Sequence, residues 1–397
     1  MKQYLLFERE EDHLRLQPFT QTRPVAFLRV GMLTIADYWS GLLSSPVQVF
    51  TQPYLQELCP FMPAKDIVFI DSAVLPDKDW AEAVQQLQSG EKIMQQGRIL
   101  AYRSPGMRSP DAVAVDAGFI LKSVPARLRK IENNWDLFQL NDEMIREQFE
   151  WITSGRQSAP LSNSNRLIGP LNQLFIEPGA RVEASVLNTE TGPIYIGQDA
   201  EVMEGCLLRG PVALGEQAVL KMGAKVYGAT TLGPFCKAGG ELNNVVFFGF
   251  SNKAHDGFLG NSVIGEWCNL GADTNNSNLK NNYASVDVWN YARQATVDSG
   301  LTFCGLFMGD HAKCGINTMF NTGTVVGVSA NVFGGDFPPK FIPSFSWGGS
   351  AWLRTFTLEK AYEVAERVMS RRGKKLSFTE REILRHIFVQ EARFRKS

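Results

Sequence analysis

The 397-residue sequence lacks the features that mark several common classes of protein. Its 40 basic and 41 acidic residues leave a net charge of −1, so there is no positive excess for general nucleic-acid binding. No apolar run reaches the roughly 18 residues that a membrane span needs. The N-terminal MKQYLLFEREED lacks a long apolar stretch and a small-residue cleavage site, so we expect no signal peptide. We predict a cytoplasmic protein that binds neither nucleic acid nor membrane.

Cysteine and histidine are also scarce. The six Cys occur singly, with no CxxC pair, and four of them fall where a coil of hexapeptide repeats takes a small buried residue. This pattern predicts core thiols in a reducing compartment. Only two of the four His lie within 166–350, which excludes a three-His zinc site of the carbonic-anhydrase kind there.

The residues up to 155 have the pattern of an α/β domain. Short apolar runs at 4–7, 66–71 and 111–121 predict strands, and helical spacing at 30–43, 79–88 and 142–152 predicts helices. Strands that alternate with helices favour a parallel or mixed sheet. The polar segment 156–165, which contains Pro and Ser, is predicted to be a linker.

A different period begins at residue 166 and continues to about 350. An aliphatic residue, usually followed by Gly and with a small residue four positions on, recurs at spacings often close to multiples of six. This pattern predicts a left-handed parallel β-helix, in which the aliphatic side chains point inward and the small residues form corners. An antiparallel sandwich would alternate with period two, which this stretch does not do. The markers are Ile176, Ile196, Leu214, Leu232, Ile264 and Met308.

The last segment, 351–397, is predicted to be helical. Ser377 and Glu380 form a capping-box pattern before an apolar-periodic run. From residue 354 on, twelve Lys and Arg stand against six Glu. Two interpretations remain: a solvated helix face that packs on the β-helix, or a basic surface that recruits an anionic ligand such as the phosphates of coenzyme A.

The block from Glu241 to Tyr283 resembles the acetyltransferase half of bifunctional N-acetylglucosamine-1-phosphate uridyltransferase / glucosamine-1-phosphate acetyltransferase. Ser251-Asn252-Lys253-Ala254-His255 matches the SKANH or SKAGH part of that family's signature. The later LG, IG, NLGA and Thr positions follow in register, with Asn278 at the Asn of NYDG. The whole chain is similar to a divergent two-domain version of this family, a Bacteroidetes-type sugar nucleotidyltransferase.

The resemblance implies a site built around His255, which would take a proton from the amine of an amino-sugar phosphate as it attacks the acetyl-CoA thioester. Ala272 would lie on the coenzyme side, with Cys314 and Ile316 as further acetyl-CoA contacts, and Asn269 would position the sugar or the base. The residues expected to bind the substrate are Lys221, Glu241, Asn243, Lys253, Asn269, Asn278 and Lys280.

The sequence departs from the family pattern at three positions. Asn243-Asn244 replaces a Lys, Phe258 replaces a Tyr, and Asp273 replaces a Gly. The family's Lys and Tyr hold the sugar phosphate, so a charge and a hydroxyl are lost. Lys221, Lys225 and Lys280 are candidates to replace that charge in space, although none of them is in register.

The segment from Arg15 to Pro24 resembles the RLxPLTxxxPK segment of sugar nucleotidyltransferases. This resemblance implies nucleotide contacts from Arg15, Thr20 and Arg23, and a Mg²⁺-holding Asp71 at a strand end, for a reaction with UTP. The Gly-rich phosphate loop of that family is absent, because FEREEDHLRL contains no Gly, and Val25 stands at the family's Lys.

We therefore expect CoA-dependent N-acetylation of glucosamine 1-phosphate, with uridylyl transfer to the sugar 1-phosphate, as in UDP-N-acetylglucosamine synthesis. The expected assembly is a homotrimer, since β-helices of this kind bury their flat faces by three-fold association. One alternative is a nucleotidyltransferase that uses its β-helix only as a trimer scaffold. The other is a non-catalytic trimer that binds sugar nucleotides.

Overall fold

The computed structural model describes residues 2–125 and 127–395, which form two compact units. The first unit comprises the residues up to 16 together with 23–28 and 33–133. The second comprises 17–22, 29–32 and the chain from 134 onward. The chain thus passes between the units several times near its N-terminus, and the predicted boundaries at 155, 165 and 350 stay predictions.

The first unit is built on a six-stranded mixed sheet with the order β4-β1-β5-β7-β6-β8. β1 lies parallel to β4 and β5, whereas β7 is antiparallel to β5 and β6. Its core includes Leu5, Phe7, Ile67, Phe69 and Tyr102, all buried. The predicted α/β class is confirmed. The elements are β1 (Gln3–Phe7), α1 (Glu10–Arg15), β3 (Leu33–Thr34), α2 (Ile35–Leu43), β4 (Val47–Phe50), β5 (Ile67–Asp71), α3 (Lys78–Gln86), β6 (Glu91–Gln95), β7 (Arg98–Ser104), α4 (Pro110–Val115) and β8 (Ile120–Lys122).

The strand predicted over 111–121 is wrong for its first half. Residues Pro110–Val115 form helix α4, and only Ile120–Lys122 form a strand. The hydroxyl of Ser109 caps the helix by accepting the Ala112 N–H, and Pro110 occupies the first turn, where its missing N–H costs nothing. These start signals override the alternating Ala and Val that favoured a strand.

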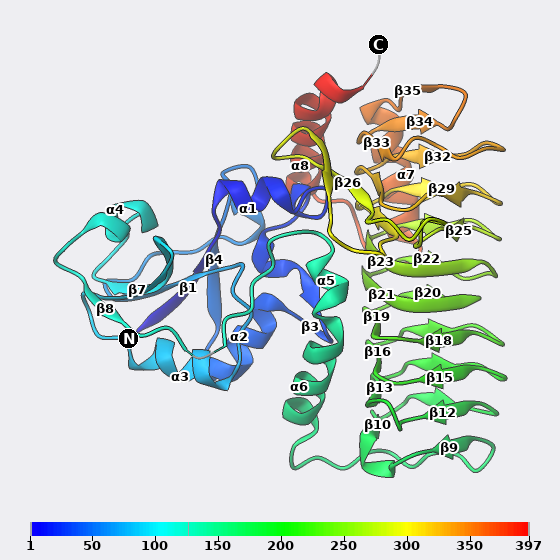
Figure 1. The fold of residues 1–397 in the computed structure, drawn as a ribbon, viewed down its shortest axis with the longest axis horizontal. Coiled ribbons are helices and arrows are strands. Elements are labelled where there is room, and N and C mark those ends of the chain that lie inside the picture. The colour runs from blue at the N-terminus through cyan, green and yellow to red at the C-terminus, as the bar shows by residue number, and fades with distance from the viewer. Residues whose placement is uncertain (1, 126, 396–397) are drawn as a thin grey trace. The chain divides into compact units, whose positions relative to one another are not determined.

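The second unit contains a parallel β-helix, whose strands stack as successive coils in Figure 1. Ile176, Ile196, Leu214 and Leu232 pair in register, and Ile264 and Met308 continue the column two coils further on. All six markers are buried, as predicted. One wall consists of β10 (Leu174–Ile176), β13 (Ile194–Ile196), β16 (Val212–Leu214), β19 (Thr230–Leu232), β21 (Glu241–Gly249), β23 (Phe258–Glu266), β28 (Leu306–Met308), β31 (Thr324–Val326) and β33 (Phe341–Ile342).

The other two walls of the coil are also parallel along most of their length. β21 and β23 are long because they continue around a corner, so the first half of β21 pairs with β18 and its second half with β19. One wall consists of β9 (Arg166–Ile168), β12 (Val186–Asn188), β15 (Leu207–Arg209) and β18 (Lys225–Tyr227). The other consists of β11 (Arg181–Val182), β14 (Glu201–Val202), β17 (Val219–Leu220), β20 (Lys237–Ala238), β22 (Asn252–Lys253), β24 (Asn269–Leu270), β29 (Lys313–Cys314), β32 (Asn331–Val332), β34 (Ser346–Gly348) and β35 (Leu353–Thr355).

Helices and two short sheets complete the second unit. The predicted capping box at Ser377 and Glu380 is present at the start of α8. The predicted helix at 142–152 is α6, whose Ile145 packs on Ala213 and Ala229 of the coil. No helix in the described part of the chain is long and apolar enough to cross a membrane. The remaining elements are β2 (Arg29–Val30), α5 (Asp136–Gln139), α6 (Asn141–Thr153), β25 (Asn275–Asn276), β26 (Asp287–Asn290), β27 (Ala295–Asp298), β30 (Met319–Phe320), α7 (Leu358–Ser370) and α8 (Phe378–Gln390).

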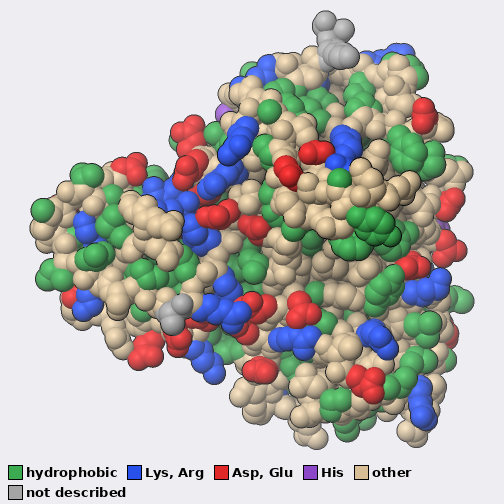
Figure 2. Space-filling model, in the orientation of Figure 1, with side chains coloured by type: hydrophobic (Ala, Val, Ile, Leu, Met, Phe, Trp, Pro, Cys, Tyr) green, Lys and Arg blue, Asp and Glu red, His purple; other side chains and the backbone are tan. Residues whose placement is uncertain are grey.

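Acidic and basic side chains are interspersed over the face shown in Figure 2. This distribution agrees with the near-zero net charge of the sequence.

Candidate functional site

His255 lies in the turn between β22 and β23, and its side chain is exposed. Backbone hydrogen bonds stack this turn on the equivalent turns of the next two coils. The Asp273 N–H donates to the Asp256 carbonyl (3.1 Å), and the Asn317 N–H donates to the Ala272 carbonyl (2.8 Å). The predicted residues His255, Ala272 and Ile316 therefore occupy the same corner of three successive coils.

Lys253 points into the coil from β22, in register with Ala238 of the preceding coil. Its side chain is 1% exposed, and its Nζ donates to the carbonyls of Gly239 (3.3 Å), His255 (2.8 Å) and Asp256 (3.1 Å). Burial lowers the pKa of Lys253 to about 8. This position does not fit the predicted contact with a substrate. Instead, the hydrogen bonds of the Lys253 ammonium hold the backbone of the turn that carries His255.

The Asn residues after β24 bond mostly to β23. Asn275 accepts the Phe258 N–H (2.8 Å), and the buried Asn276 both accepts the Gly260 N–H (2.8 Å) and donates to the Gly260 carbonyl (3.1 Å). Asn278, predicted to contact the substrate, donates to the side chain of Asn261 (2.7 Å). The polar run therefore aligns the strand that follows His255.

Glu241 and Asn243 lie side by side on the wall that leads away from the His255 turn. Glu241 is in register with Lys225 on one side and Phe258 on the other, and Asn243 with Tyr227 and Gly260. Glu241 accepts the Tyr227 hydroxyl at 2.5 Å, and this hydrogen bond raises the pKa of Tyr227 to about 12. Both predicted residues are half-buried and present polar atoms next to the corner.

Of the remaining predicted residues of the β-helix, some are accessible to solvent and others are held by contacts within the protein. Asn269 is exposed on β24, and Ile316 is 69% exposed. Lys280 is held by Asp287 (2.9 Å) and by the Ser285 carbonyl (2.6 Å). Cys314 points inward, with its sulfur 3.3 Å from the hydroxyl of Thr274, and burial raises its pKa. Cys314 is therefore not placed to touch a coenzyme, whereas Asn269 and Ile316 are accessible.

In the first unit, the surroundings of Asp71 do not fit a magnesium site. Its carboxylate is fully buried, and one oxygen accepts both Nε (2.8 Å) and Nη2 (2.6 Å) of Arg98 while the other accepts the Ala73 N–H (3.0 Å). Arg98 also bonds Asp12. Burial raises the pKa of Asp71, and the charge of Arg98 opposes that shift. Across the described residues, no group of three His, Cys, Asp or Glu is arranged to hold a metal.

The segment that would carry a phosphate loop forms a helix instead. α1 buries Asp12 and His13, and Arg15 donates to Asp12 at 2.6 Å. Just before it, the carboxylate of Glu8 accepts the backbone N–H groups of Val25 (2.7 Å) and Gln52 (3.2 Å) and the Thr51 hydroxyl (2.6 Å). Donors of this kind are the ones that a phosphate would use.

The other two residues predicted to bind nucleotide are buried and belong to different units. Thr20 is fully buried in the second unit, and Arg23 is 8% exposed in the first. Because both side chains are buried, neither Thr20 nor Arg23 is placed to contact a nucleotide.

Sequence reasoning missed a stack of rings along another corner of the coil. Phe235 stacks on Phe250 (4.8 Å between centroids), Phe250 on Trp267 (4.2 Å), and Trp267 on His311 (6.4 Å). All four residues have a positive φ, near +60°. Phe235, Phe250 and Trp267 recur at about one coil length in the sequence, which was the available signal, whereas the longer segment 268–310 separates His311 from them. His311 therefore has a structural place as a member of this stack.

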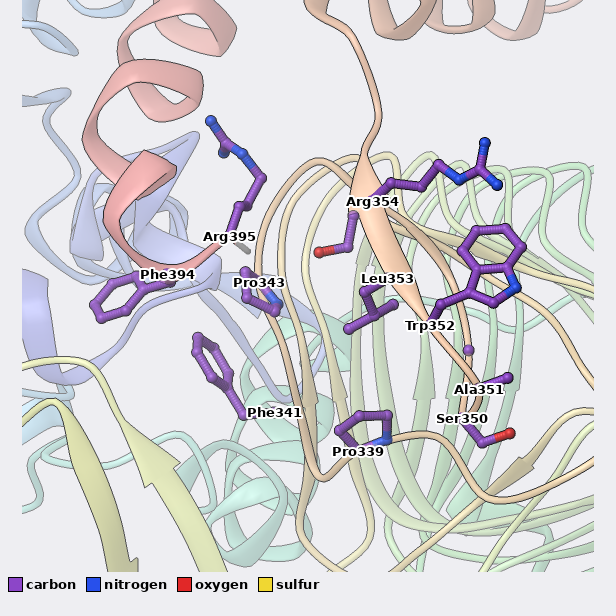
Figure 3. Close-up of a pocket in the computed structure, with 12 residues that line it drawn as sticks. Pro339, Phe341, Pro343, Ser350, Ala351, Trp352, Leu353, Arg354, Phe394 and Arg395 are labelled. Carbon is purple, nitrogen blue, oxygen red and sulfur yellow. The ribbon is translucent and has the colours of Figure 1, made fainter. Parts of the chain in front are cut away.

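A pocket of about 570 Å³ lies at the last coils of the β-helix. Figure 3 shows Phe341 and Phe394 on one side of it, and Trp352 and Arg354 directed away from them. None of the predicted site residues lines this pocket. The accessible surface beside His255, and not this pocket, is therefore the candidate site.

Comparison with known proteins relates the N-terminal part of the chain to one family. Residues 4–157 match the family of sugar nucleotidyl transferases. The chain is also 30% identical, over 146 residues, to a bifunctional sugar-1-phosphate nucleotidylyltransferase/acetyltransferase of Sulfurisphaera tokodaii. That match covers 36% of this chain and 36% of the relative, so the chain spans about a third of the relative's length.

Three solved structures are similar at low identity. A UDP-N-acetylglucosamine acyltransferase of Francisella novicida has a TM-score of 0.27 and 11% identity, covering 59% of this chain and 89% of that one. Its Arabidopsis counterpart has a TM-score of 0.23 and 16% identity, covering 60% and 95%. AntD, an N-acyltransferase from Bacillus cereus in complex with dTDP and 3-hydroxybutyryl-CoA, has a TM-score of 0.21 and 12% identity, covering 57% and 97%. The family match therefore covers residues 4–157, in the N-terminal part of the chain, and it shows a similarity to sugar nucleotidyl transferases there.

Proposed function

We propose that this protein is a transferase that moves the acetyl group of acetyl-CoA to the amine of an amino-sugar phosphate, glucosamine 1-phosphate, with His255 as general base. The observation that carries the proposal is the placement of His255: its ring is exposed at a coil corner, while the buried ammonium of Lys253 fixes the backbone beneath it. The relative that matches part of this chain is named a nucleotidylyltransferase/acetyltransferase, and an acetyltransferase activity is in keeping with the proposal.

The proposed reaction is a direct displacement at the thioester. The amine nitrogen forms a bond to the acetyl carbon while His255 takes the proton that the nitrogen releases. The bond from carbon to sulfur then breaks, and coenzyme A leaves as the thiol after it gains a proton. Glu241 and Asn243 offer acceptors and donors for sugar hydroxyls, and Asn269, Ala272 and Ile316 line the accessible side of the corner.

The direct test is the product. Incubation of the full chain with isotopically labelled acetyl-CoA and glucosamine 1-phosphate is expected to give an N-acetylated sugar phosphate, identified by mass spectrometry, together with one free thiol per product. Absence of product with this acceptor, with other amino sugars and with nucleotide-linked amino sugars would contradict the proposal.

Uridylyl transfer to a sugar 1-phosphate is the second candidate, since residues 4–157 match the sugar nucleotidyl transferase family. The contacts of Asp71 and Glu8 oppose it, because both carboxylates are already bonded within the unit. Magnesium-dependent release of pyrophosphate from UTP and N-acetylglucosamine 1-phosphate would establish it.

We also propose that three copies associate through the β-helix, so that neighbouring subunits complete each site. Sedimentation equilibrium should then give three times the 44.2 kDa mass of the chain. A monomer that retains full activity would contradict this assembly.

A further inference from the structure

Four basic side chains gather on the wall of the coil that leads to the His255 corner. Lys237 points outward from β20, and Lys221 follows β17 in the preceding coil. Arg371 and Arg372 come from the turn after α7. The Nη2 of Arg372 donates to the carbonyl of Phe235 (3.4 Å), two residues before Lys237, which anchors that turn on the same coil. The C-terminal segment thus adds two guanidinium groups to two coil lysines.

The charge of this cluster is not neutralised. Within residues 2–125 and 127–395, no ion pair within 4 Å involves Lys221, Lys237, Arg371 or Arg372. The pKa of Lys237 is lowered, first by burial and then by the positive charges of Arg372, Lys221 and Arg371, while Glu201 opposes the shift. Side chains that repel one another in this way bind a multivalent anion favourably, because it removes the repulsion.

Two glycines, Gly239 and Gly240, lie between the cluster and the proposed base, at a point where neighbouring coils approach closely. Gly239 lies between Lys221 and Ala254 in consecutive coils, and a Cβ at Gly239 would stand 3.2 Å from the Lys221 Cβ and 2.7 Å from the Ala254 carbonyl oxygen. A Cβ at Gly240 would likewise stand 2.6 Å from the carbonyl oxygen of Gly257. The intervening coil therefore carries no side chain at these two positions, and Lys221 and His255 stand two coils apart, or roughly 10 Å at the strand spacing of parallel sheets.

We propose that Lys221, Lys237, Arg371 and Arg372 form the phosphate-binding subsite of the acyl-transfer site. This inference rests on the proposed function, and it gives the ligand's class: an organic phosphate whose reacting group reaches His255 across Gly239 and Gly240. The cluster would supply the positive charge that the family motif provides with a Lys and that Asn243-Asn244 lacks, from two segments that are distant in the sequence. The phosphate belongs either to the acceptor sugar or to coenzyme A.

Calorimetric titration of the full chain tests the subsite without turnover. Four ligands are compared: coenzyme A against 3′-dephospho-coenzyme A, and glucosamine 1-phosphate against glucosamine. The variants are Lys237→Met alone and Lys237→Met combined with Arg372→Gln. The control is Lys360→Met, an exposed lysine of α7 paired with Glu363. Circular dichroism confirms that each variant is folded.

The wild type and Lys360→Met should prefer the phosphorylated member of one pair, and the double variant should bind that member about 10- to 100-fold more weakly, as expected for two lost charge-assisted contacts. The single variant should show a smaller loss. The pair that shows the preference identifies the source of the phosphate. Equal binding within both pairs by the wild type, or a preference that survives in the double variant, would overturn the subsite.

Turnover separates this inference from the proposed function. If the wild type is active but shows no phosphate preference, the subsite is refuted and the proposed acetyl transfer stands. If the wild type is inactive but its phosphate preference is lost in the double variant, the subsite stands and the proposed acetyl transfer is refuted.

Discussion

The ammonium of Lys253 occupies an interior position that neighbouring coils give to Ala238, Leu270 and Cys314. A charge in such a place is costly unless it is fully hydrogen-bonded, and three carbonyls supply that compensation. Two of those carbonyls belong to His255 and Asp256. The lysine of the SNKAH motif thus acts on the site through the backbone, a role that the motif alone does not reveal because strand register decides which way the side chain points.

Glu391 offers a test of burial at the residue scale. It is 3% exposed, and burial raises its pKa from the ordinary 4.5 to about 7, against the opposing charges of Arg393 and Arg395. Between these two pH values the folded chain holds a proton that the unfolded chain has lost. The free energy of unfolding should therefore fall as pH rises from 4.5 to 7, by at most about 3 kcal/mol.

Thermal melts at pH 5 and pH 8 check this expectation. Glu391→Gln, which mimics the protonated acid, should lose less stability than the wild type over that interval. The control is Glu382→Gln on the exposed face of α8, which should follow the wild type. Parallel curves for the wild type and Glu391→Gln would refute the assignment.

At the scale of elements, the corners of the coil combine strained backbone with stacked rings. Phe250 has φ = 54° and is held between the rings of Phe235 and Trp267. Its left-handed conformation costs about 1 kcal/mol for a residue with a Cβ. The stack offsets that cost, which is why aromatic residues are tolerated at positions that otherwise favour glycine or asparagine.

Two substitutions at this corner separate the contributions. Phe250→Ala should destabilise the β-helix by about 2 kcal/mol, since it removes stacking and retains the strain. Phe250→Gly should destabilise it by about 1 kcal/mol less, because glycine adopts the left-handed region freely. Urea denaturation followed by far-ultraviolet circular dichroism measures both. A glycine variant less stable than the alanine variant would contradict the account.

The β-helix was predictable because each coil repeats the same physical requirement at a nearly fixed interval. The column through Ile196, Leu214 and Ile264 shows this directly, although Phe247 fills the same column in a coil whose sequence lacks the marker pattern. The start of α4 was not predicted, since its caps outweigh a local alternation. The contact of Arg372 with the coil could not be predicted either, because it joins segments that are far apart in the sequence.

At the scale of the whole chain, the two units differ in how well they fit their expected chemistry. In the first unit, Glu8, Asp12 and Asp71 are satisfied by internal donors. Filling a nucleotide site would require these bonds to break. We expect no magnesium-dependent binding of UTP to the full chain by calorimetry. Binding that requires magnesium and is lost in Asp71→Asn would contradict this expectation and restore the nucleotidyltransferase alternative.

The proposed acetyl transfer depends most directly on one side chain. The measurement is the rate of thiol release from acetyl-CoA with glucosamine 1-phosphate, for the wild type and for His255→Ala at matched stability. Loss of a general base predicts a rate about 10²- to 10⁴-fold lower in the variant, with unchanged assembly. A variant that retains the wild-type rate would show that His255 is not the base.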